Sequence, residues 1–374
     1  MSNTAMRWIL FCMCLLLQIL TADAQAPLPR DSIKPRLRLG FIGLKGHIGA
    51  VLAGAKSLGD VDVVAVAESD PKLLASWQKR ELLFGGARGF ADWKQLVAEA
   101  KLDVCCVAGE SGERFEQLKA LVERDVDIVS EKPLVTTLVD LERLRQGFEK
   151  SKSRLTMLLE LRHQPKNVRV REIIQRGDIG EVCQVTTQKS YQWRDRPDWY
   201  SSRERLGGTI PYIGIHSLDT VRWVTGLDFG HVAAFHGKIG GPKFVETENH
   251  ASILAQLVGG ASVTARLDYL RPAGAKSTSD DRLRVIGTKG VVEVNEGDET
   301  IRLIVSDRIQ QIPFGETENL FVEFVTFLRG GLPPRITADD CFYMTEVVLK
   351  ARQAADDRTM IQLTPPGLVH HSNQ

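Results

Sequence analysis

The arrangement of apolar and polar positions changes along this chain near residue 161. Before that point, short apolar runs such as Leu37 to Ile42 and Val61 to Ala67 are separated by stretches with the spacing of amphipathic helices. Similar runs occur at 103–108, 126–130 and 154–160. Strands that alternate with helices are typical of a doubly wound parallel sheet, so the pattern predicts an α/β domain of the Rossmann type over 36–161.

After residue 161, long β-like runs replace this alternation, and several are joined by glycine-containing hairpin turns. The expected strands are Gly180–Tyr191, His231–Lys238, Glu248–Leu257, Ser262–Tyr269, Arg282–Gly287, Gly290–Asn295 and Thr300–Ser306. Helices are expected at Lys166–Arg176, Leu320–Arg329 and Asp339–Asp356. The pattern therefore predicts an α+β domain over 162–363, with a mostly antiparallel sheet covered by helices on one face, and a tail over 364–374.

The first residues follow a third pattern. Trp8 to Leu20 is apolar except for Gln18, and it lies between Arg7 and the small-x-small sequence that ends at Ala24. This predicts a signal peptide over 1–24, cleaved after Ala24, then a linker over 25–35 and an exported, periplasmic or secreted protein. A membrane anchor is the competing interpretation, but these 13 residues fall short of the roughly 20 that span a bilayer.

Length and charge narrow the classes of function. The 374 residues are enough for two domains. The 48 basic and 47 acidic residues nearly cancel, which argues against a nucleic-acid partner and favours a small, neutral or weakly charged ligand. The cysteines beyond the signal peptide are scattered and show no CxxC spacing, so neither a disulfide framework nor a metal site is expected.

A glycine-rich turn follows the first strand. It reads Gly43-Leu44-Lys45-Gly46-His47-Ile48-Gly49 and precedes a helix. Glycines let the backbone turn sharply and approach a pyrophosphate, whose charge the free amides at a helix start favour. The candidate cofactor-binding residues here are Gly43, Gly46, His47, Ile48 and Gly49.

Glu68 ends the second strand, about 20 residues after the glycines. A carboxylate at that point accepts hydrogen bonds from ribose hydroxyls and repels a 2′-phosphate, so NAD is favoured over NADP. The alternative is a solvated acid at a strand end.

The apolar run Ile128-Val129-Ser130 ends in Glu131-Lys132-Pro133. In an open parallel sheet, ligands bind beyond the carboxyl ends of the strands, so Lys132 should project into that crevice. Lys132 is the first catalytic candidate. The alternative is a charged pair that merely solvates the strand end before a proline stops it.

A second catalytic candidate lies on a helix about 80 residues further on, where His216 and Asp219 are three residues apart and share a face. The Asp219 carboxylate could hold the imidazole in one tautomer, as a general base needs. A half-buried histidine with satisfied hydrogen bonds is the alternative.

Aromatic and arginine side chains are concentrated between Tyr191 and Arg203. Aromatic rings stack on apolar sugar faces, and arginine forks bind hydroxyls or carboxylates. The segment is therefore interpreted as a wall for a saccharide or sugar acid, or equally as a subunit contact. The candidate substrate residues in it are Trp193, Trp199, Tyr200 and Arg203.

Taken together, the glycine loop, Glu68, the Glu-Lys-Pro motif and the His216 segment resemble the Gfo/Idh/MocA family of nicotinamide-dependent oxidoreductases, from about Arg36 to about Leu363. The Glu-Lys-Pro motif carries most of the specificity. The resemblance implies that Glu131, Lys132 and Pro133 also lie at the cofactor, and that Arg162, in an Arg-x-x-Pro segment, enters the substrate domain.

The same resemblance implies an activity: transfer of a hydride between NAD and a hydroxyl of a sugar, polyol or sugar acid. Lys132 would bind the hydroxyl oxygen and His216 would take its proton. It also implies a homo-oligomer that assembles through the open face of the second sheet.

The sequence departs from the family pattern at three places. Lys45 stands where most members have the second glycine, Gly109 to Arg114 replace a Thr-Pro-Asn and histidine segment, and Tyr212 replaces the first acid of the AspxGlyxHisxxAsp motif. A tyrosine is neutral at pH 7 and cannot compensate the charge of Lys132 as a carboxylate would, although a phenol can relay a proton. Two alternatives therefore stay open: an NAD-dependent glycosidase that oxidises, eliminates and returns the hydride, and a non-catalytic exported carbohydrate-binding relative.

Overall fold

The computed structural model describes residues 36–80, 82–240 and 246–366. From Leu37 onward the chain forms one unit. The predicted signal peptide, the linker and most of the tail lie outside the described residues. Within the described part, no helix has the length and apolar character needed to cross a bilayer.

The first sheet has six parallel strands in the order β3-β2-β1-β4-β5-β6. Its central strands are buried along their whole length, as expected where helices cover both faces of a parallel sheet. Its elements are β1 (Leu37–Ile42), α2 (Ile48–Leu58), β2 (Val61–Ala67), α3 (Pro71–Arg80), β3 (Arg88–Phe90), α4 (Trp93–Glu99), β4 (Val104–Val107), α5 (Arg114–Val122), β5 (Asp127–Ser130), α6 (Leu138–Glu149) and β6 (Leu155–Met157). This confirms the predicted Rossmann-type domain, and the strand order reverses between β1 and β4, the position where such sheets bind ligands.

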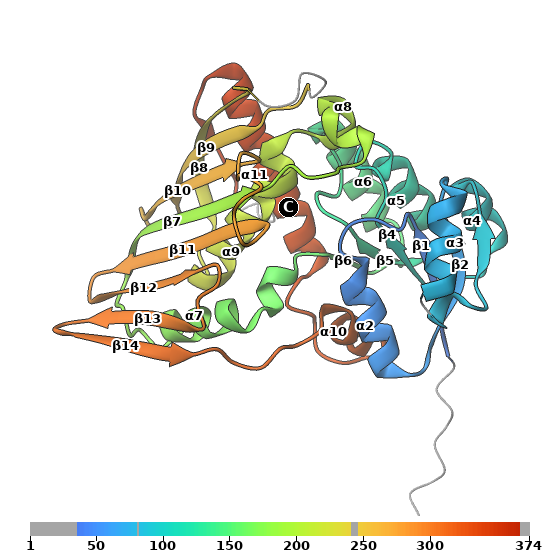
Figure 1. The fold of residues 1–374 in the computed structure, drawn as a ribbon, viewed down its shortest axis with the longest axis horizontal. Helices are drawn as coiled ribbons and strands as arrows, with labels where there is room; N and C mark the ends of the chain where they lie inside the picture. Colours follow the sequence, from blue (N-terminus) through green and yellow to red (C-terminus); the bar gives the residue numbers. More distant parts are fainter. Residues whose placement is uncertain (1–35, 81, 241–245, 367–374) are drawn as a thin grey trace, which may run out of the picture. The chain divides into compact units, whose positions relative to one another are not determined.

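The second sheet has nine strands in the order β14-β13-β12-β11-β7-β10-β9-β8-β15 (Figure 1). All neighbours are antiparallel except β7 and β10, which confirms the predicted mostly antiparallel sheet. The strands are β7 (Val182–Tyr191), β8 (Phe229–Gly237), β9 (His250–Leu257), β10 (Ser262–Asp268), β11 (Ser279–Gly287), β12 (Gly290–Asn295), β13 (Thr300–Val305), β14 (Arg308–Pro313) and β15 (Ile361–Gln362). The short edge strands β3, β14 and β15 were not predicted, because few apolar positions mark them.

One face of this sheet is covered by helices and the other is open. Along β9 and β10, buried and exposed residues alternate, the pattern of a sheet solvated on one side. The helices of this half are α7 (Pro165–Gln175), α8 (Arg203–Leu206), α9 (Ile215–Thr225), α10 (Leu320–Leu328) and α11 (Ala338–Asp357), with shorter turns η2 (Glu160–His163), η3 (Asp198–Ser201) and η4 (Ile210–Gly214).

Helix α10 comes from the second half of the chain but packs against α2 of the first domain (Figure 1). Asn319 caps α10 by accepting from the amides of Phe321 and Val322, and its amide group donates to the Ala50 carbonyl at 2.9 Å. A side chain at Gly54 would meet the Asn319 oxygen at 2.3 Å, so the glycine permits this close approach. The predicted boundary at residue 161 thus marks the change of sheet, but α10 completes the first domain.

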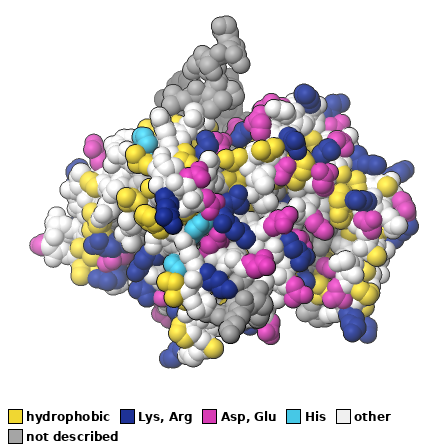
Figure 2. Space-filling view, turned by 90° about the horizontal axis from the view of Figure 1, so that it is seen from above, with side chains coloured by type: hydrophobic (Ala, Val, Ile, Leu, Met, Phe, Trp, Pro, Cys, Tyr) yellow, Lys and Arg dark blue, Asp and Glu magenta, His cyan; other side chains and the backbone are white. Residues whose placement is uncertain are grey.

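Acidic and basic side chains are interspersed over the face shown in Figure 2. This distribution accords with the near balance of 48 basic and 47 acidic residues in the sequence.

Candidate active site

The glycine loop joins β1 to α2 and depends on two glycines in the left-handed region. Gly43 has φ +82° and Gly46 has φ +78°. A side chain at Gly43 would come within 2.6 Å of Gly109, and one at Gly46 within 2.4 Å of Glu131 Oε1. At Gly49 an added carbon meets no atom within 4 Å, so space is left over the start of α2. The loop thus has the open, glycine-dependent shape that a bound pyrophosphate requires.

A cavity of about 490 Å³ opens beyond the carboxyl ends of β1, β2 and β4. The glycine loop and Glu68 line one side, and the second domain closes the other with Pro197 to Trp199 and Arg205. Glu68 accepts a hydrogen bond from the Leu44 amide at 3.1 Å, which fixes its carboxylate beside the loop. These residues fit the diphosphate and ribose of a dinucleotide. Trp199, predicted as a substrate residue, lies at this cavity instead.

Lys45, the first departure from the family pattern, does not obstruct the glycine loop. Its side chain is exposed, it lines the same cavity, and its φ is not positive. The backbone therefore does not need glycine at this position.

The carboxylate of Glu131 contacts the glycine loop at His47. Its Oε1 accepts from the His47 amide at 2.5 Å and lies 2.6 Å from His47 Nδ1. Burial acts to raise the pKa of the carboxyl, but His47 and the Lys132 charge outweigh burial and hold the pKa well below its usual range. Glu131 and His47 were predicted to bind the cofactor; the Glu131 carboxylate faces the loop backbone, so its role is to position the loop.

Lys132 follows β5 and is buried, with 2 % of its surface exposed. Its Nζ donates to the Tyr212 carbonyl at 2.8 Å and lies 3.6 Å from the centroid of the Tyr212 ring. Burial lowers the pKa of Lys132 to about 7, against the opposing charge of Glu131. The Lys132-Pro133 peptide bond is cis. Lys132 is thus a buried amine that gains and loses a proton near neutral pH.

Tyr212, the third departure from the family pattern, contacts Lys132 directly. It lies in the π-helical turn η4, and its hydroxyl is hydrogen bonded to that of Tyr200. Its ring face, which carries partial negative charge, meets the Lys132 ammonium. Burial raises the pKa of Tyr212 well above its usual range, so the phenol stays neutral.

The predicted pair of His216 and Asp219 is wrong. Asp219 binds Arg162 instead, with Nη2 to Oδ1 at 2.6 Å, and no partner among the described residues reaches His216 Nδ1. A guanidinium offers the carboxylate two parallel charge-assisted bonds, which a neutral imidazole cannot match. Burial and the nearby Lys132 charge lower the pKa of His216 well below its usual range. His216 does lie at the site, with its ring centroid 5.5 Å from that of His47.

Two predicted substrate residues are structural. Arg162 is 2 % exposed and also binds Asp340 and the Arg335 carbonyl, so its fork is fully used within the protein. Arg203 pairs with Asp356 at 2.6 Å and with Glu248 at 3.0 Å, beside α11. Both arginines pair with carboxylates from distant segments of the chain, which local sequence does not reveal.

Two of the remaining predicted substrate residues, Tyr200 and Trp199, form an aromatic layer with Tyr212. The Tyr200 ring lies 5.0 Å from that of Tyr212, and Trp199 lies 4.2 Å from Tyr200. Trp193 packs edge-on against Tyr269 at 5.4 Å. Tyr200 therefore lies beside the Tyr212 ring that contacts Lys132, whereas Trp193 contacts Tyr269.

Two arginines that were not among the candidate site residues assemble the site. Arg114, 1 % exposed, donates to the carbonyls of Pro133 and Gly109 and so ties the loops after β4 and β5 together. Arg205 of the second domain binds Glu110 of the first, with Nε to Oε1 at 2.6 Å, at the edge of the 490 Å³ cavity. The extra negative charge in the second departure from the family pattern is therefore neutralised.

Within the described ranges, no group of three or more His, Cys, Asp or Glu side chains is arranged to hold a metal ion.

The fold and site define a two-domain oxidoreductase with a dinucleotide cofactor. Residues 37–159 match the family described as oxidoreductases with an NAD-binding Rossmann fold, and residues 167–293 match the GFO/IDH/MocA C-terminal domain. A putative oxidoreductase from Thermotoga maritima superposes with a TM-score of 0.82 at 30 % identity, covering 87 % of this chain and 100 % of that one. The chain belongs to the Gfo/Idh/MocA family.

Curated relatives agree with this assignment. The rhizopine catabolism protein MocA of Rhizobium meliloti is 25 % identical over 82 % of this chain and 90 % of its own length. The myo-inositol 2-dehydrogenase of Thermotoga maritima is 22 % identical over 87 % of this chain and 98 % of its own. The putative oxidoreductase YteT of Bacillus subtilis is 25 % identical, but only 42 % of its length is matched. The predicted family, its oxidoreductase class and its NAD cofactor are confirmed.

Proposed function

We propose that this enzyme oxidises a hydroxyl of a sugar, polyol or sugar acid with NAD, and that Lys132 carries the hydroxyl proton. The observation that carries the proposal is a buried amine with a pKa of about 7, held against Tyr212 at the carboxyl end of β5. A general base works best when its pKa lies near the working pH. A relative of similar length is named for a polyol, myo-inositol, which supports the substrate class.

The residues that would hold the cofactor are the glycine loop, with Gly43, Gly46 and Gly49, and Glu68. Glu68 suits the ribose hydroxyls of NAD and would repel the 2′-phosphate of NADP. When bound, the nicotinamide supplies the acceptor for the hydride that leaves the carbinol carbon.

Lys132 accepts the proton of the hydroxyl at Nζ as the carbinol carbon is oxidised. The ammonium that forms is stabilised by the Tyr212 carbonyl and ring, which already contact Nζ. Burial of Lys132 and Tyr212 excludes water from this transfer. In the reverse direction, the ammonium returns the proton to the oxygen.

His216 has a different role from the predicted general base. A histidine whose pKa is well below its usual range is a weak proton acceptor, and Lys132 is better matched to neutral pH. The neutral ring, with Nδ1 free of partners in the described part of the chain, offers a hydrogen bond that orients the substrate hydroxyl.

A second candidate is the cycle in which oxidation, elimination and return of the hydride leave NAD bound. Two contacts across the cavity edge favour a retained cofactor: the Glu110–Arg205 ion pair, and the Gly112 amide bonded to the Arg205 carbonyl at 2.8 Å. In this cycle no NADH accumulates.

Assembly and location are further parts of the proposal. Phe235 and Leu254 of the second sheet are 72 % and 57 % exposed, which supports a homo-oligomer formed through the open face. Export rests on the apolar run before Ala24.

The test begins with the cofactor. Purified protein is denatured, any released nucleotide is identified by mass, and NAD and NADP are titrated calorimetrically into nucleotide-free protein. We expect NAD to be retained or to bind more tightly than NADP. If neither is retained nor binds below about 1 mM, both catalytic proposals fail.

The reaction is then followed with a panel of sugars, polyols and sugar acids. NADH accumulation supports the oxidoreductase, whereas substrate cleavage without NADH supports the retained-cofactor cycle. Lys132→Met should bind NAD as the unchanged protein does and show neither reaction.

A further inference from the structure

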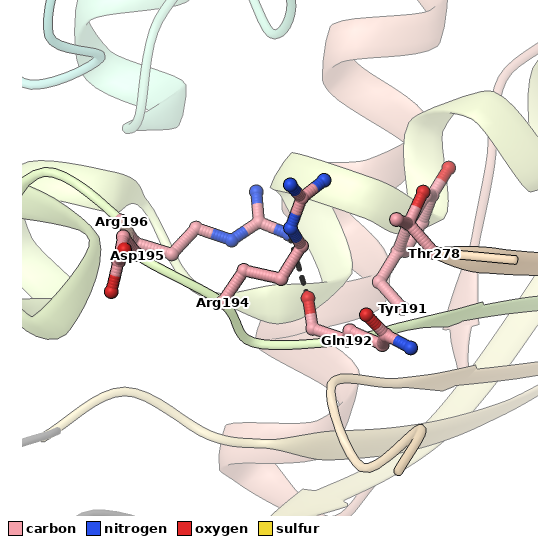
Figure 3. A pocket seen from close by; sticks show the side chains of 6 residues that line it. All are labelled: Tyr191, Gln192, Arg194, Asp195, Arg196 and Thr278. Atoms are coloured by element: carbon pink, nitrogen blue, oxygen red, sulfur yellow. Dashed lines mark hydrogen bonds between the residues drawn. The ribbon is translucent and has the colours of Figure 1, made fainter. Parts of the chain in front are cut away.

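A second pocket, of about 500 Å³, lies where β7 ends (Figure 3). It shares no lining residue with the cavity at the glycine loop. Its lining is polar and consists of Tyr191, Gln192, Arg194, Asp195, Arg196 and Thr278. Two arginines from one short loop therefore serve the same pocket.

Arg194 is held in an unusual backbone conformation. Its φ is +52°, in the left-handed region that favours glycine. Its side chain is exposed, and no hydrogen bond or ion pair joins its guanidinium to the described part of the chain. Strained backbone of this kind is concentrated at ligand sites, and an arginine without a protein partner keeps its whole fork for a ligand.

Arg196 is fixed in place. Its Nε donates to the Trp193 carbonyl at 2.8 Å and its Nη2 to the Gln192 carbonyl at 3.2 Å. Its guanidinium lies 5.0 Å from the Tyr200 ring centroid and 5.2 Å from that of Tyr269. Figure 3 shows both arginine side chains extending from the loop into the pocket. A guanidinium held in this way loses little freedom when it binds a ligand.

The charges of the pocket favour an anion. Two guanidiniums and the single carboxylate of Asp195 leave one excess positive charge among the lining residues. The planar fork of arginine matches a carboxylate, with two parallel hydrogen bonds. A carboxylate between Arg194 and Arg196 would relieve the repulsion of these like charges.

The pocket is close to the proposed reaction centre. Arg196 stacks on Tyr200, the Tyr200 hydroxyl is bonded to that of Tyr212, and the Tyr212 ring carries Lys132. One aromatic layer therefore separates the arginine pair from the amine. A substrate that contacts both must therefore pass the edge of this layer, beside the Tyr200–Tyr212 pair.

We propose that this pocket binds the carboxylate of the substrate, so that the enzyme acts on sugar acids in preference to neutral sugars. The inference rests on the proposed function, because it assumes that the reacting hydroxyl lies at Lys132. Arg194 and Arg196 determine this specificity and take no part in proton transfer.

The test compares acids with the matching neutral sugars. D-Glucuronate and D-galacturonate, with D-glucose and D-galactose as neutral counterparts, are titrated calorimetrically into the NAD-loaded enzyme, and kcat/KM is measured for each. We expect at least one acid to bind about tenfold or more tightly than its neutral counterpart. Arg194→Gln should weaken binding of that acid about tenfold or more and change binding of its neutral counterpart less than about twofold.

Two further variants test the role of the Arg194 fork and serve as a control. Arg194→Lys keeps the charge without the fork and should lose part of the affinity. Arg308→Gln removes an exposed arginine of β14, at the other edge of the sheet, and should change nothing. Equal affinity for acids and neutral sugars, or an Arg194→Gln variant that binds the acid as well as the unchanged enzyme, overturns the inference.

Failure of the two proposals is distinguishable. If neutral sugars reduce NAD and the acids do not bind, the carboxylate site is wrong and the oxidoreductase proposal stands. If an acid binds in an Arg194-dependent way and no substrate reacts, the carboxylate site stands and the catalytic proposal is wrong.

Discussion

At the scale of single residues, the site depends on what surrounds one amine. Lys132 meets a ring face and a carbonyl where most of the family has a carboxylate. A carboxylate would favour the ammonium and raise the pKa, whereas the neutral Tyr212 leaves burial as the largest influence. Burial, with no carboxylate from Tyr212 to offset it, therefore lowers the pKa of Lys132 to about 7.

The first prediction follows from the sign of this shift. Below a pH of about 7 Lys132 is protonated and cannot accept a proton, so kcat/KM for oxidation should rise with pH through about 7 and then level off. For reduction, which needs the ammonium, kcat/KM should fall over the same range. Tyr212→Asp should move both midpoints upward. Unchanged midpoints in initial-rate pH profiles of the two enzymes would contradict the role given to Tyr212.

The sequence predicted where Lys132 lies in the fold but not which side chains it contacts. Its position after an apolar strand placed it at the carboxyl edge of the sheet. Tyr212, however, is 80 residues away, and the contact of its ring with Nζ depends on packing between two domains. For the same reason, spacing paired His216 with Asp219, and only coordinates show that Arg162 takes the carboxylate.

At the scale of elements, the shape of the β1–α2 loop depends on its contact with the Glu131 carboxylate. Gly46 and Gly177 both have a positive φ, +78° and +77°. A side chain at Gly46 would collide with Glu131, whereas at Gly177 it meets nothing within 4 Å. The two glycines therefore separate the cost of backbone strain from the cost of moving Glu131.

The second prediction uses this pair. Gly46→Ala and Gly177→Ala should each lower the free energy of unfolding by about 1–2 kcal/mol through backbone strain. Only Gly46→Ala should also lower the affinity for NAD, by about tenfold or more, because displacing Glu131 distorts the glycine loop. Calorimetric titration and denaturant unfolding measure the two quantities. Equal NAD affinity in both variants would show that Glu131 does not shape the cofactor site.

A third prediction concerns the buried ion pair that joins η2 to α9. Asp219→Ala leaves the Arg162 guanidinium without its main partner, and should lower the free energy of unfolding by about 3–5 kcal/mol. Glu99→Gln, which breaks the exposed pair with Arg88, should cost less than about 1 kcal/mol. If Asp219→Ala instead unfolds with the same free energy as the unchanged protein, the Arg162–Asp219 pair does not stabilise the fold.

At the scale of elements the sequence was most informative where apolar runs are long. The parallel strands and the long strands of the second sheet were predicted because each buries a continuous or alternating set of side chains.

At the scale of the whole molecule, two domains meet over the cofactor cavity. Arg205 and Glu110 lie 95 residues apart and close its edge. The Arg205 side chain is 48 % exposed, so the pair is open to solvent and salt. Such an exposed pair should have only a modest effect on the rate at which the cofactor cavity opens.

The fourth prediction is that Arg205→Ala releases bound NADH about two- to fivefold faster, and that high salt speeds release from the unchanged enzyme by a similar factor. Arg282→Ala, which breaks a comparable exposed pair with Asp280, should release NADH at the normal rate. The rates are followed by NADH fluorescence after a chase with unlabelled NAD. The same rate in Arg205→Ala and in the unchanged enzyme would rule out this contact as a barrier.

Helix α10 limits how this protein can be divided or recombined. Its buried residue Phe321 packs at Gly54 of α2, although Asn319 and Ala50 are 269 residues apart in the chain. A fragment that stops at residue 161 would expose the apolar surface of α2 that α10 covers, and it should precipitate during expression. In a chimera that takes its second half from a relative, that half must contain a helix whose side chains leave room at Gly54. The two halves of the chain therefore fold as one unit.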